Sequence, residues 1–146
     1  MRKYFLIPAL LLGLQLTAAE NSASTGEFVW NELATSNVQQ AKDFYGNTFG
    51  WEFTDKKMDD MTYTFIKKGG KDFGGIWAIP TEMQNQIPPH WLAYILVDNL
   101  DQSVENAVKN GATIVKPKQK AGDMGVFVIL KDPAGAHIAL WQPTKK

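Results

Sequence analysis

The hydrophobic pattern of this chain repeats itself. In the first half, an apolar run that begins at Phe28 precedes residues at helical spacing, and further strand-like runs follow up to GGIWAIP. In the second half the same order starts at His90 and ends in AHIALWQP. A repeat of about 50 residues indicates two copies of one supersecondary unit. The order in each copy is a strand, a helix and three more strands, or βαβββ.

The first copy is expected to contain one short amphipathic helix among its strands. Thr35, Ser36 or Asn37 can cap this helix, and Val38 and Tyr45 recur on one face of it. The charged run 55–60 is interpreted as a solvated turn. The strands are predicted at 28–33, 51–54, 61–67 and 73–79.

The second copy follows a polar, proline-containing linker. Asp98 or Asn99 is expected to cap its helix, whose apolar face begins at Leu100 and Val104. Pro117 is expected to end the strand that follows this helix, before a loop at 118–125. The strands are predicted at 90–97, 112–116, 126–130 and 136–141.

Each helix can cover only one face of its sheet, so the other face needs a second cover. The economical cover is the other half of the chain. We therefore predict an α+β fold of two βαβββ modules, at about 26–80 and 90–143, joined by a linker at 81–89. Two sheets that face each other would enclose a cleft, and clefts bind small molecules.

The N-terminus has the pattern of a secretory signal peptide at 1–19. A short basic start precedes an apolar run from Tyr4 to Leu16, and small residues precede Glu20. The run is short for a membrane-spanning helix, although an uncleaved anchor stays an alternative. No Cys follows for lipid attachment, so a periplasmic or secreted location without a membrane partner is expected.

Composition narrows the function classes further. The 15 basic and 15 acidic residues give a formal net charge of zero, and no basic cluster predicts nucleic-acid binding. The absence of Cys excludes disulfides, thiolate metal sites and a Cys nucleophile. The core must therefore be held together by burial.

Several segments resemble a known family. The run AKDFYGNTFGW, then KNGATIVKP, then DMGVFVILKDPAGAHIALWQP, resemble motifs of the glyoxalase/bleomycin-resistance/extradiol-dioxygenase (vicinal oxygen chelate) superfamily. The resemblance covers about residues 26–143. It implies one domain in which two βαβββ modules form a curved eight-stranded sheet around a central cup, and it allows a homodimer.

Enzymes of this family hold a divalent metal in the cup with about four His, Glu or Asp ligands. The spacing of the family motifs places these positions at Trp30, Leu92 and Ala139, with Ile76 as the fourth when Pro80 is aligned with Pro143. None of these side chains can bind a metal. We therefore expect no metal and no other cofactor. A slip of one residue would turn the set to the opposite face of the strand.

Glu32 is the candidate catalytic residue. It shares a strand face with Trp30, so a cup-facing Glu32 would be a carboxylate among aromatics. Desolvation would then raise its pKa and suit it to act as a general base or a ligand acceptor. The alternative is a structural pairing with a backbone donor or a Lys.

The two histidines permit a second hypothesis. His137 shares the parity of Ala139, and His90 lies at a strand start. With Glu32 they could form a facial triad for a divalent metal, which would make the protein a lyase, isomerase or dioxygenase with a displaced ligand set.

The aromatic residues Trp30, Trp77, Tyr94 and Trp141 can belong to the core or line the cup. Our first prediction is an exported protein that binds a small, flat or apolar molecule without a metal. A non-catalytic interaction module with a filled cup is a further alternative. The expected ligand-binding residues are Trp30, Glu32, Ile76, Leu92, Tyr94, His137 and Ala139.

Overall fold

The computed structural model describes residues 23–58 and 61–145. It confirms the order βαβββ in both halves of the chain. The expected signal peptide at 1–19 lies outside the described residues. The elements are β1 (Phe28–Thr35), α1 (Val38–Phe49), β2 (Glu52–Met58), β3 (Met61–Lys68), β4 (Lys71–Ala78), the short helix η1 (Thr81–Met83), β5 (His90–Leu96), α2 (Leu100–Lys109), β6 (Thr113–Lys120), β7 (Gly125–Lys131) and β8 (His137–Pro143).

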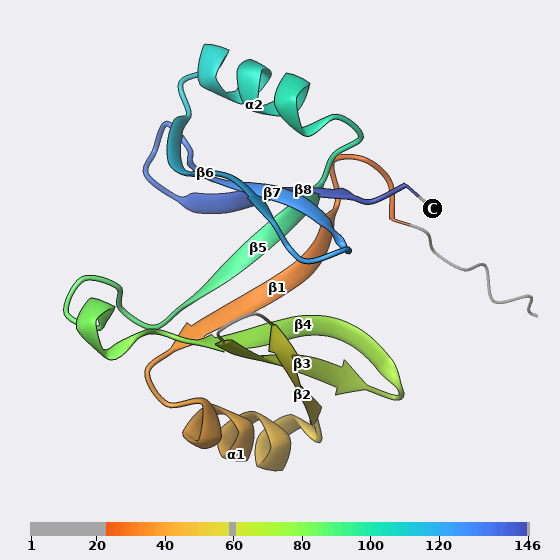
Figure 1. Cartoon of the computed structure of the whole chain (residues 1–146), viewed down its shortest axis with the longest axis vertical. Coiled ribbons are helices and arrows are strands. Elements are labelled where there is room, and N and C mark those ends of the chain that lie inside the picture. Colours follow the sequence, from red (N-terminus) through yellow and green to blue (C-terminus); the bar gives the residue numbers. More distant parts are fainter. Residues whose placement is uncertain (1–22, 59–60, 146) are drawn as a thin grey trace, which may run out of the picture.

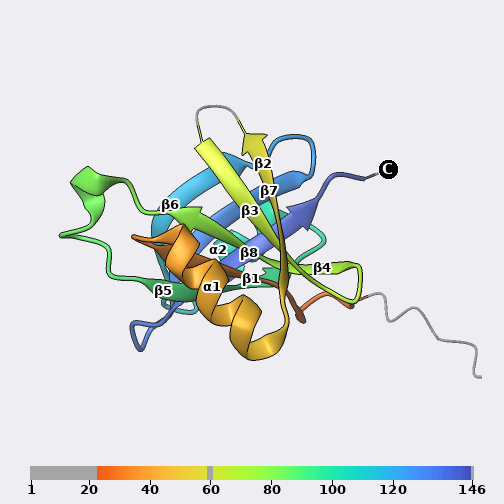
Figure 2. The ribbon, with the colours of Figure 1, turned by 90° about the horizontal axis from the view of Figure 1, so that it is seen from below.

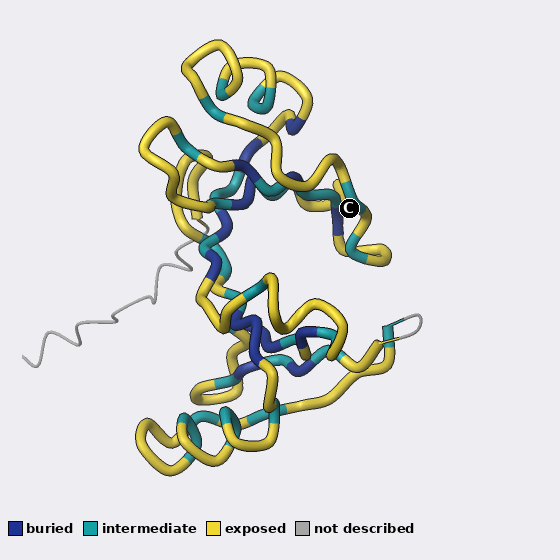
Figure 3. Tube along the Cα trace, turned by 90° about the vertical axis from the view of Figure 1, so that its left-hand side faces the viewer, coloured by how far each residue is buried: buried dark blue, intermediate teal, exposed yellow. Residues whose placement is uncertain are grey.

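All eight strands form one sheet in the order β2-β3-β4-β1-β5-β8-β7-β6. Within each module the first and last strands are parallel neighbours, and the antiparallel pair β1–β5 joins the modules. Figure 1 shows β1 and β5 crossing the middle of the molecule, with one helix at each end. In Figure 2, seen from below, α1 lies in front and α2 lies behind the sheet. In Figure 3 the chain trace curves into an open C with both helices on its outside. The predicted α+β fold with a curved eight-stranded sheet is therefore confirmed.

The two helices begin at equivalent asparagines. The side chain of Asn37 accepts a hydrogen bond from the backbone N–H of Gln40, and Asn99 accepts one from Gln102 in the same way. Each bond satisfies one N–H that the first turn of a helix leaves free. Because the two caps are equivalent, residues at the same distance before Asn37 and Asn99 occupy equivalent positions in the two modules.

Each module has its own core beneath its helix. Under α2 the buried residues are aliphatic, with Leu100 packing on Val128 and Leu130. Under α1 the buried residues Leu33, Ile66 and Ile76 meet a shell that includes the aromatic rings of Tyr45, Trp51, Phe53 and Phe73. In Figure 3 the buried stretches lie mostly along the middle of the trace, whereas the two helices at its outer ends are mostly exposed or intermediate.

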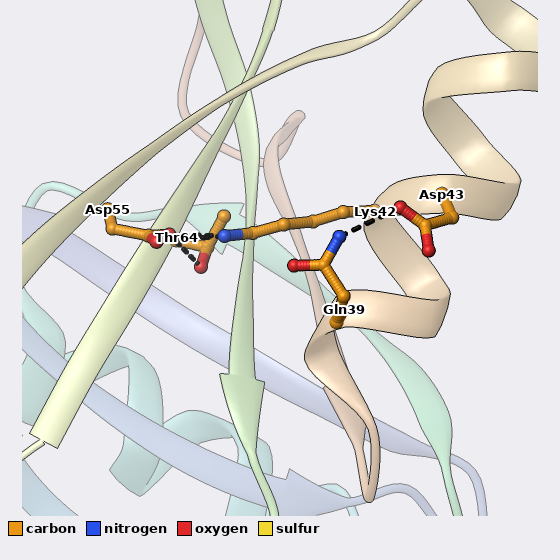
Figure 4. A network of polar contacts seen from close by, with 5 residues as sticks. All are labelled: Gln39, Lys42, Asp43, Asp55 and Thr64. Atoms are coloured by element: carbon orange, nitrogen blue, oxygen red, sulfur yellow. Dashed lines mark hydrogen bonds and ion pairs between the residues drawn. The ribbon is translucent and has the colours of Figure 1, made fainter.

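A polar network fastens α1 to the sheet (Figure 4). Lys42 of α1 forms an ion pair with Asp55 of β2, at 2.7 Å, and the hydroxyl of buried Thr64 donates to the same carboxylate at 2.6 Å. These hydrogen bonds, from Lys42 first and Thr64 second, lower the pKa of Asp55. Gln39 and Asp43 form a separate contact along the helix.

Two strands are longer than the sequence predicted. The charged run expected to be a turn belongs to β2 up to Met58, because it pairs residue by residue with β3. Pro117 does not end β6, which continues to Lys120. β6 lies at the edge of the sheet, where a proline costs no ladder hydrogen bond. Among the described residues, no helix has the length and apolar character needed to cross a membrane.

Candidate functional site

A cavity of about 610 Å³ lies on the concave face of the sheet. Its size is in the range of small-molecule sites. Aromatic side chains from β1, β3, β4, β5, β7 and β8 line it, so both modules contribute to its wall: Trp30, Tyr63, Phe65, Trp77, Tyr94, Phe127 and Trp141.

At the floor of this cavity, Glu32 is held by two tyrosines from different modules. The hydroxyl of Tyr63 donates to Oε2 at 2.7 Å, and that of Tyr94 donates to Oε1 at 3.0 Å. The indole N–H of Trp30 in turn donates to the Tyr63 hydroxyl at 3.0 Å. We call these four residues the Glu32 cluster. It fixes the plane of a carboxylate whose remaining lone pairs stay available as acceptors.

Burial raises the pKa values of the three titratable groups of this cluster. Desolvation raises the pKa of Glu32, and it outweighs the hydrogen bonds from Tyr63 and Tyr94 and the positive charges of Lys116 and His90, which lower it. Burial and the neighbouring carboxylate also raise the pKa of both tyrosines. The two phenols therefore remain O–H donors, and Glu32 becomes a stronger proton acceptor than an exposed carboxylate.

Gly75 of β4 makes the cluster possible. A Cβ atom at this position would collide with the hydroxyl and ring of Tyr63. Glycine thus leaves the space through which the phenol reaches Glu32. On the neighbouring parallel strand β1, the residue that pairs with Gly75 is Glu32 itself.

Further charged and polar side chains also line the cavity. Lys116, Gln119 and Lys120 line it from β6, and Asp72 and His90 line it from β4 and β5. The ammonium of Lys116 lies 5.8 Å from the centre of the Phe127 ring, a distance at which a cation and an aromatic face attract each other.

Most of the residues expected from the sequence lie at this site. Trp30, Glu32, Leu92 and Tyr94 line the cavity. Ala139 is fully buried and packs with Leu92 and Tyr94 in the floor. Whether these residues bind a ligand stays a prediction. Trp77 and Trp141, which could have been core residues, also line the cavity.

Two expected residues lie elsewhere. His137 is exposed at the start of β8 and does not line the cavity. Ile76 is buried under α1 with Leu33 and Ile66, on the opposite face of the sheet. Its expected place in the cup is therefore wrong.

The sequence alignment that selected Ile76 is shifted by one residue along β4. Strand pairing sets Gly75 beside Glu32 and Ala139 beside Tyr94, and the caps make Glu32 equivalent to Tyr94. Gly75 is therefore the counterpart of Ala139. The alignment on Pro80 and Pro143 failed because the first module has one more residue between its tryptophan and its proline.

The donor set does not fit the family's metal. After this correction the four positions hold Trp30, Gly75, Leu92 and Ala139, none of which offers a ligand atom from its side chain. In the parts of the chain that the structure describes, no three His, Cys, Asp or Glu residues lie together as a metal site. The triad of Glu32, His90 and His137 is thus not assembled.

The sequence reasoning missed three residues of the site: Tyr63, Gly75 and Lys116. The alternation at 61–67 places Tyr63 and Phe65 on one strand face, but it does not say which face lies inside. The strand predicted at 112–116 includes Lys116, but the sequence pattern gives this residue no function. Only the register of β6 against β7, which pairs Lys116 with Ile129, brings it to the cavity.

Comparison with known proteins supports this architecture. The chain is 31% identical over 118 residues to the "Putative glyoxylase CFP32" of Mycobacterium bovis, covering 80% of this chain and 45% of that protein. It is 24% identical over 129 residues to the "Anthracycline biosynthesis protein DnrV" of Streptomyces peucetius, covering 80% and 47%. The chain thus spans about half the length of these relatives.

A solved structure shares the fold at low identity. Methylmalonyl-CoA epimerase from Mycobacterium tuberculosis superimposes with a TM-score of 0.60 at 16% identity, covering 82% of this chain and 89% of that one.

A family model covers most of the chain. The model described as "Glyoxalase/Bleomycin resistance protein/Dioxygenase superfamily" matches residues 13–140, a range that begins inside the expected signal peptide. The cup, the paired modules and this match lead to one conclusion: the chain belongs to the Glyoxalase/Bleomycin resistance protein/Dioxygenase superfamily.

Proposed function

We propose that this protein binds a small, flat or apolar molecule in its cup without a metal ion. The observation that carries the proposal is the Glu32 cluster at the floor of an aromatic cavity of about 610 Å³. Flat ligands stack on or against aromatic rings. One oriented polar acceptor in an apolar wall is the usual means of fixing a ligand's orientation.

The chemistry of the cup favours this reading over the alternatives. The equivalents of the family's ligand positions carry Trp, Gly, Leu and Ala, which argues against a metal-dependent lyase, isomerase or dioxygenase. A cavity of this volume argues against an interaction module whose cup is filled by its own side chains.

Three flat probes test the proposal: 2-naphthol, indole and quinoline, titrated by calorimetry into the whole mature protein. We expect saturable binding of at least one probe, with one molecule per chain. Replacing Trp77 with Ala should weaken it about tenfold, because a stacking surface is lost. Trp91→Ala is the matched control, since Trp91 is exposed and does not line the cavity.

The result that would refute binding is equally clear. If none of the three probes binds with a dissociation constant below about 1 mM, or if Trp77→Ala and Trp91→Ala have equal effects, the cup is not a site for flat molecules.

A second candidate function is proton transfer with Glu32 as general base. The supporting observation is that burial raises the pKa of this cavity-lining carboxyl toward the range in which bases work at neutral pH. Glu32→Gln would then abolish turnover while leaving ligand affinity within about threefold. Loss of affinity without any measurable turnover in the wild type would leave Glu32 as a binding residue only.

Export and self-association complete the proposal. The N-terminal pattern supports cleavage after residue 19, and mass spectrometry of the protein from the producing cell would show the mature N-terminus. Sedimentation at several concentrations would show whether it forms the homodimer that the family permits.

A further inference from the structure

Among the charged residues that line the cavity, Glu32 and Lys116 have opposite charges and do not contact each other. Glu32 lies at the floor of the cavity, and Lys116 reaches it from β6 at the far edge of the sheet. In residues 23–58 and 61–145 no ion pair joins them, and none joins Lys116 to another carboxylate. Nevertheless the charge of Lys116 acts on Glu32, because it opposes the rise of the Glu32 pKa.

The register of the sheet explains this placement. Lys116 pairs with Ile129, Ile129 with Ala139, and Ala139 with Tyr94, which donates to Glu32. One row of residues therefore crosses the cup from the cation to the carboxylate. Four strand spacings separate β6 from β1, or roughly 19 Å along the sheet, and its curvature brings the two ends closer across the cavity.

Lys116 lies near an aromatic ring of the cavity wall. Its ammonium lies 5.8 Å from the centre of the Phe127 ring, which itself lines the cavity. An ammonium in this setting attracts an anion, since charge-assisted hydrogen bonds are stronger than neutral ones. At the floor the opposite ligand group is favoured, because the lone pairs of Glu32 accept hydrogen bonds from an O–H or N–H donor.

We propose that the ligand of this cup is a flat aromatic acid with a polar donor at its opposite end, bound with its anionic group on Lys116 and its O–H or N–H on Glu32. This inference rests on the proposed binding function and adds the ligand's chemical class to it. A hydroxylated or aminated bicyclic carboxylate has the required form: two polar ends separated by an apolar plane.

Four matched probes separate the two ends: 6-hydroxy-2-naphthoate, its methyl ester, 2-naphthoate and 2-naphthol. Calorimetry on the mature protein should give the tightest binding for 6-hydroxy-2-naphthoate, about tenfold tighter than for its ester. Added salt should reduce this advantage, since ions screen a partly exposed charge pair.

The variants assign each end to a residue. Lys116→Gln should abolish the advantage of the acid over the ester. Lys131→Gln should preserve it, because Lys131 is exposed and lies outside the cavity. Glu32→Gln should reduce the advantage of 6-hydroxy-2-naphthoate over 2-naphthoate. This variant should still bind the acid more tightly than its methyl ester.

The outcomes distinguish this inference from the binding function beneath it. Equal affinity of the wild type for the acid and the ester, or equal losses in Lys116→Gln and Lys131→Gln, would overturn the inference while the cup remains a site for flat molecules. If none of the four probes binds, the inference and the binding function both fail.

Discussion

The two modules share one backbone plan but build different floors for the cup. Glu32 in the first module and Tyr94 in the second occupy equivalent positions before their helix caps, and they bond to each other. The other equivalent pairs are Trp30 and Leu92, Tyr63 and Phe127, and Gly75 and Ala139, as the caps and strand pairings show. The first module thus carries most of the polar groups of the floor.

This difference shows that one module can supply most of the polar groups of a site, while the other mainly completes its wall. In the first module, glycine opens space for a tyrosine hydroxyl. In the second, Ala139 fills that space and Phe127 has no hydroxyl to place there. The helices differ as well, since α2 buries Leu100 in an aliphatic core whereas no residue of α1 is fully buried.

The largest expected effect concerns the two helices. Leu100→Ala should lower the free energy of unfolding by about 2–5 kcal/mol, because it opens a cavity in a buried core. Val38→Ala, on the half-buried face of α1, should cost about 1 kcal/mol. Urea denaturation of both variants measures this contrast, and equal losses would show that the helices are anchored alike.

The next largest effect is expected for Gly75→Ala. It should lower the free energy of unfolding by about 1–3 kcal/mol, because the added methyl group overpacks against Tyr63. The loss should shrink in a Tyr63→Leu background, in which the ring is absent. A double-mutant cycle by urea denaturation measures this coupling. Additive losses would mean that Gly75 is needed for another reason.

Removing the hydroxyl groups of the two tyrosines in the cluster should lower the free energy of unfolding by different amounts. Tyr63→Phe removes a hydroxyl that makes two hydrogen bonds, and Tyr94→Phe removes one that makes a single bond. We expect losses of about 2 and 1 kcal/mol, respectively. Thermal unfolding of the two variants compares them, and a larger loss for Tyr94→Phe would contradict the arrangement.

The smallest effect is a pH dependence from Glu32. Its pKa is raised by burial, so between about pH 4 and that raised pKa the folded chain keeps a proton that the unfolded chain releases. The free energy of unfolding therefore falls as pH rises through this window. Relative to wild type, Glu32→Gln should become progressively more stable as the pH rises through this window, because it has no carboxyl to titrate. Parallel pH profiles of stability for the two proteins would refute the shift.

The sequence predicted the fold well because its signals are local. Helix caps, hydrophobic periodicity and turn residues gave both modules and their order, and the strand parity of Trp30 and Glu32 was correct. The predicted place of Ile76 in the cup was wrong because the register of a strand depends on its pairing with neighbouring strands. The alignment of a single proline did not define that pairing. Tyr63 and Lys116 were missed since their approach to the cavity depends on sheet curvature and on distant strand pairs.

The most direct test of the account concerns the centre of the cup, which we propose to be a carboxylate–tyrosine cluster instead of a metal site. The purified protein is incubated with Fe²⁺, Zn²⁺ and Ni²⁺ and then dialysed. Its ratio of metal to protein and its melting temperature are then measured with and without chelator. We predict no retained stoichiometric ion and an unchanged melting temperature. One ion per chain, whose removal lowers the melting temperature, would contradict the account.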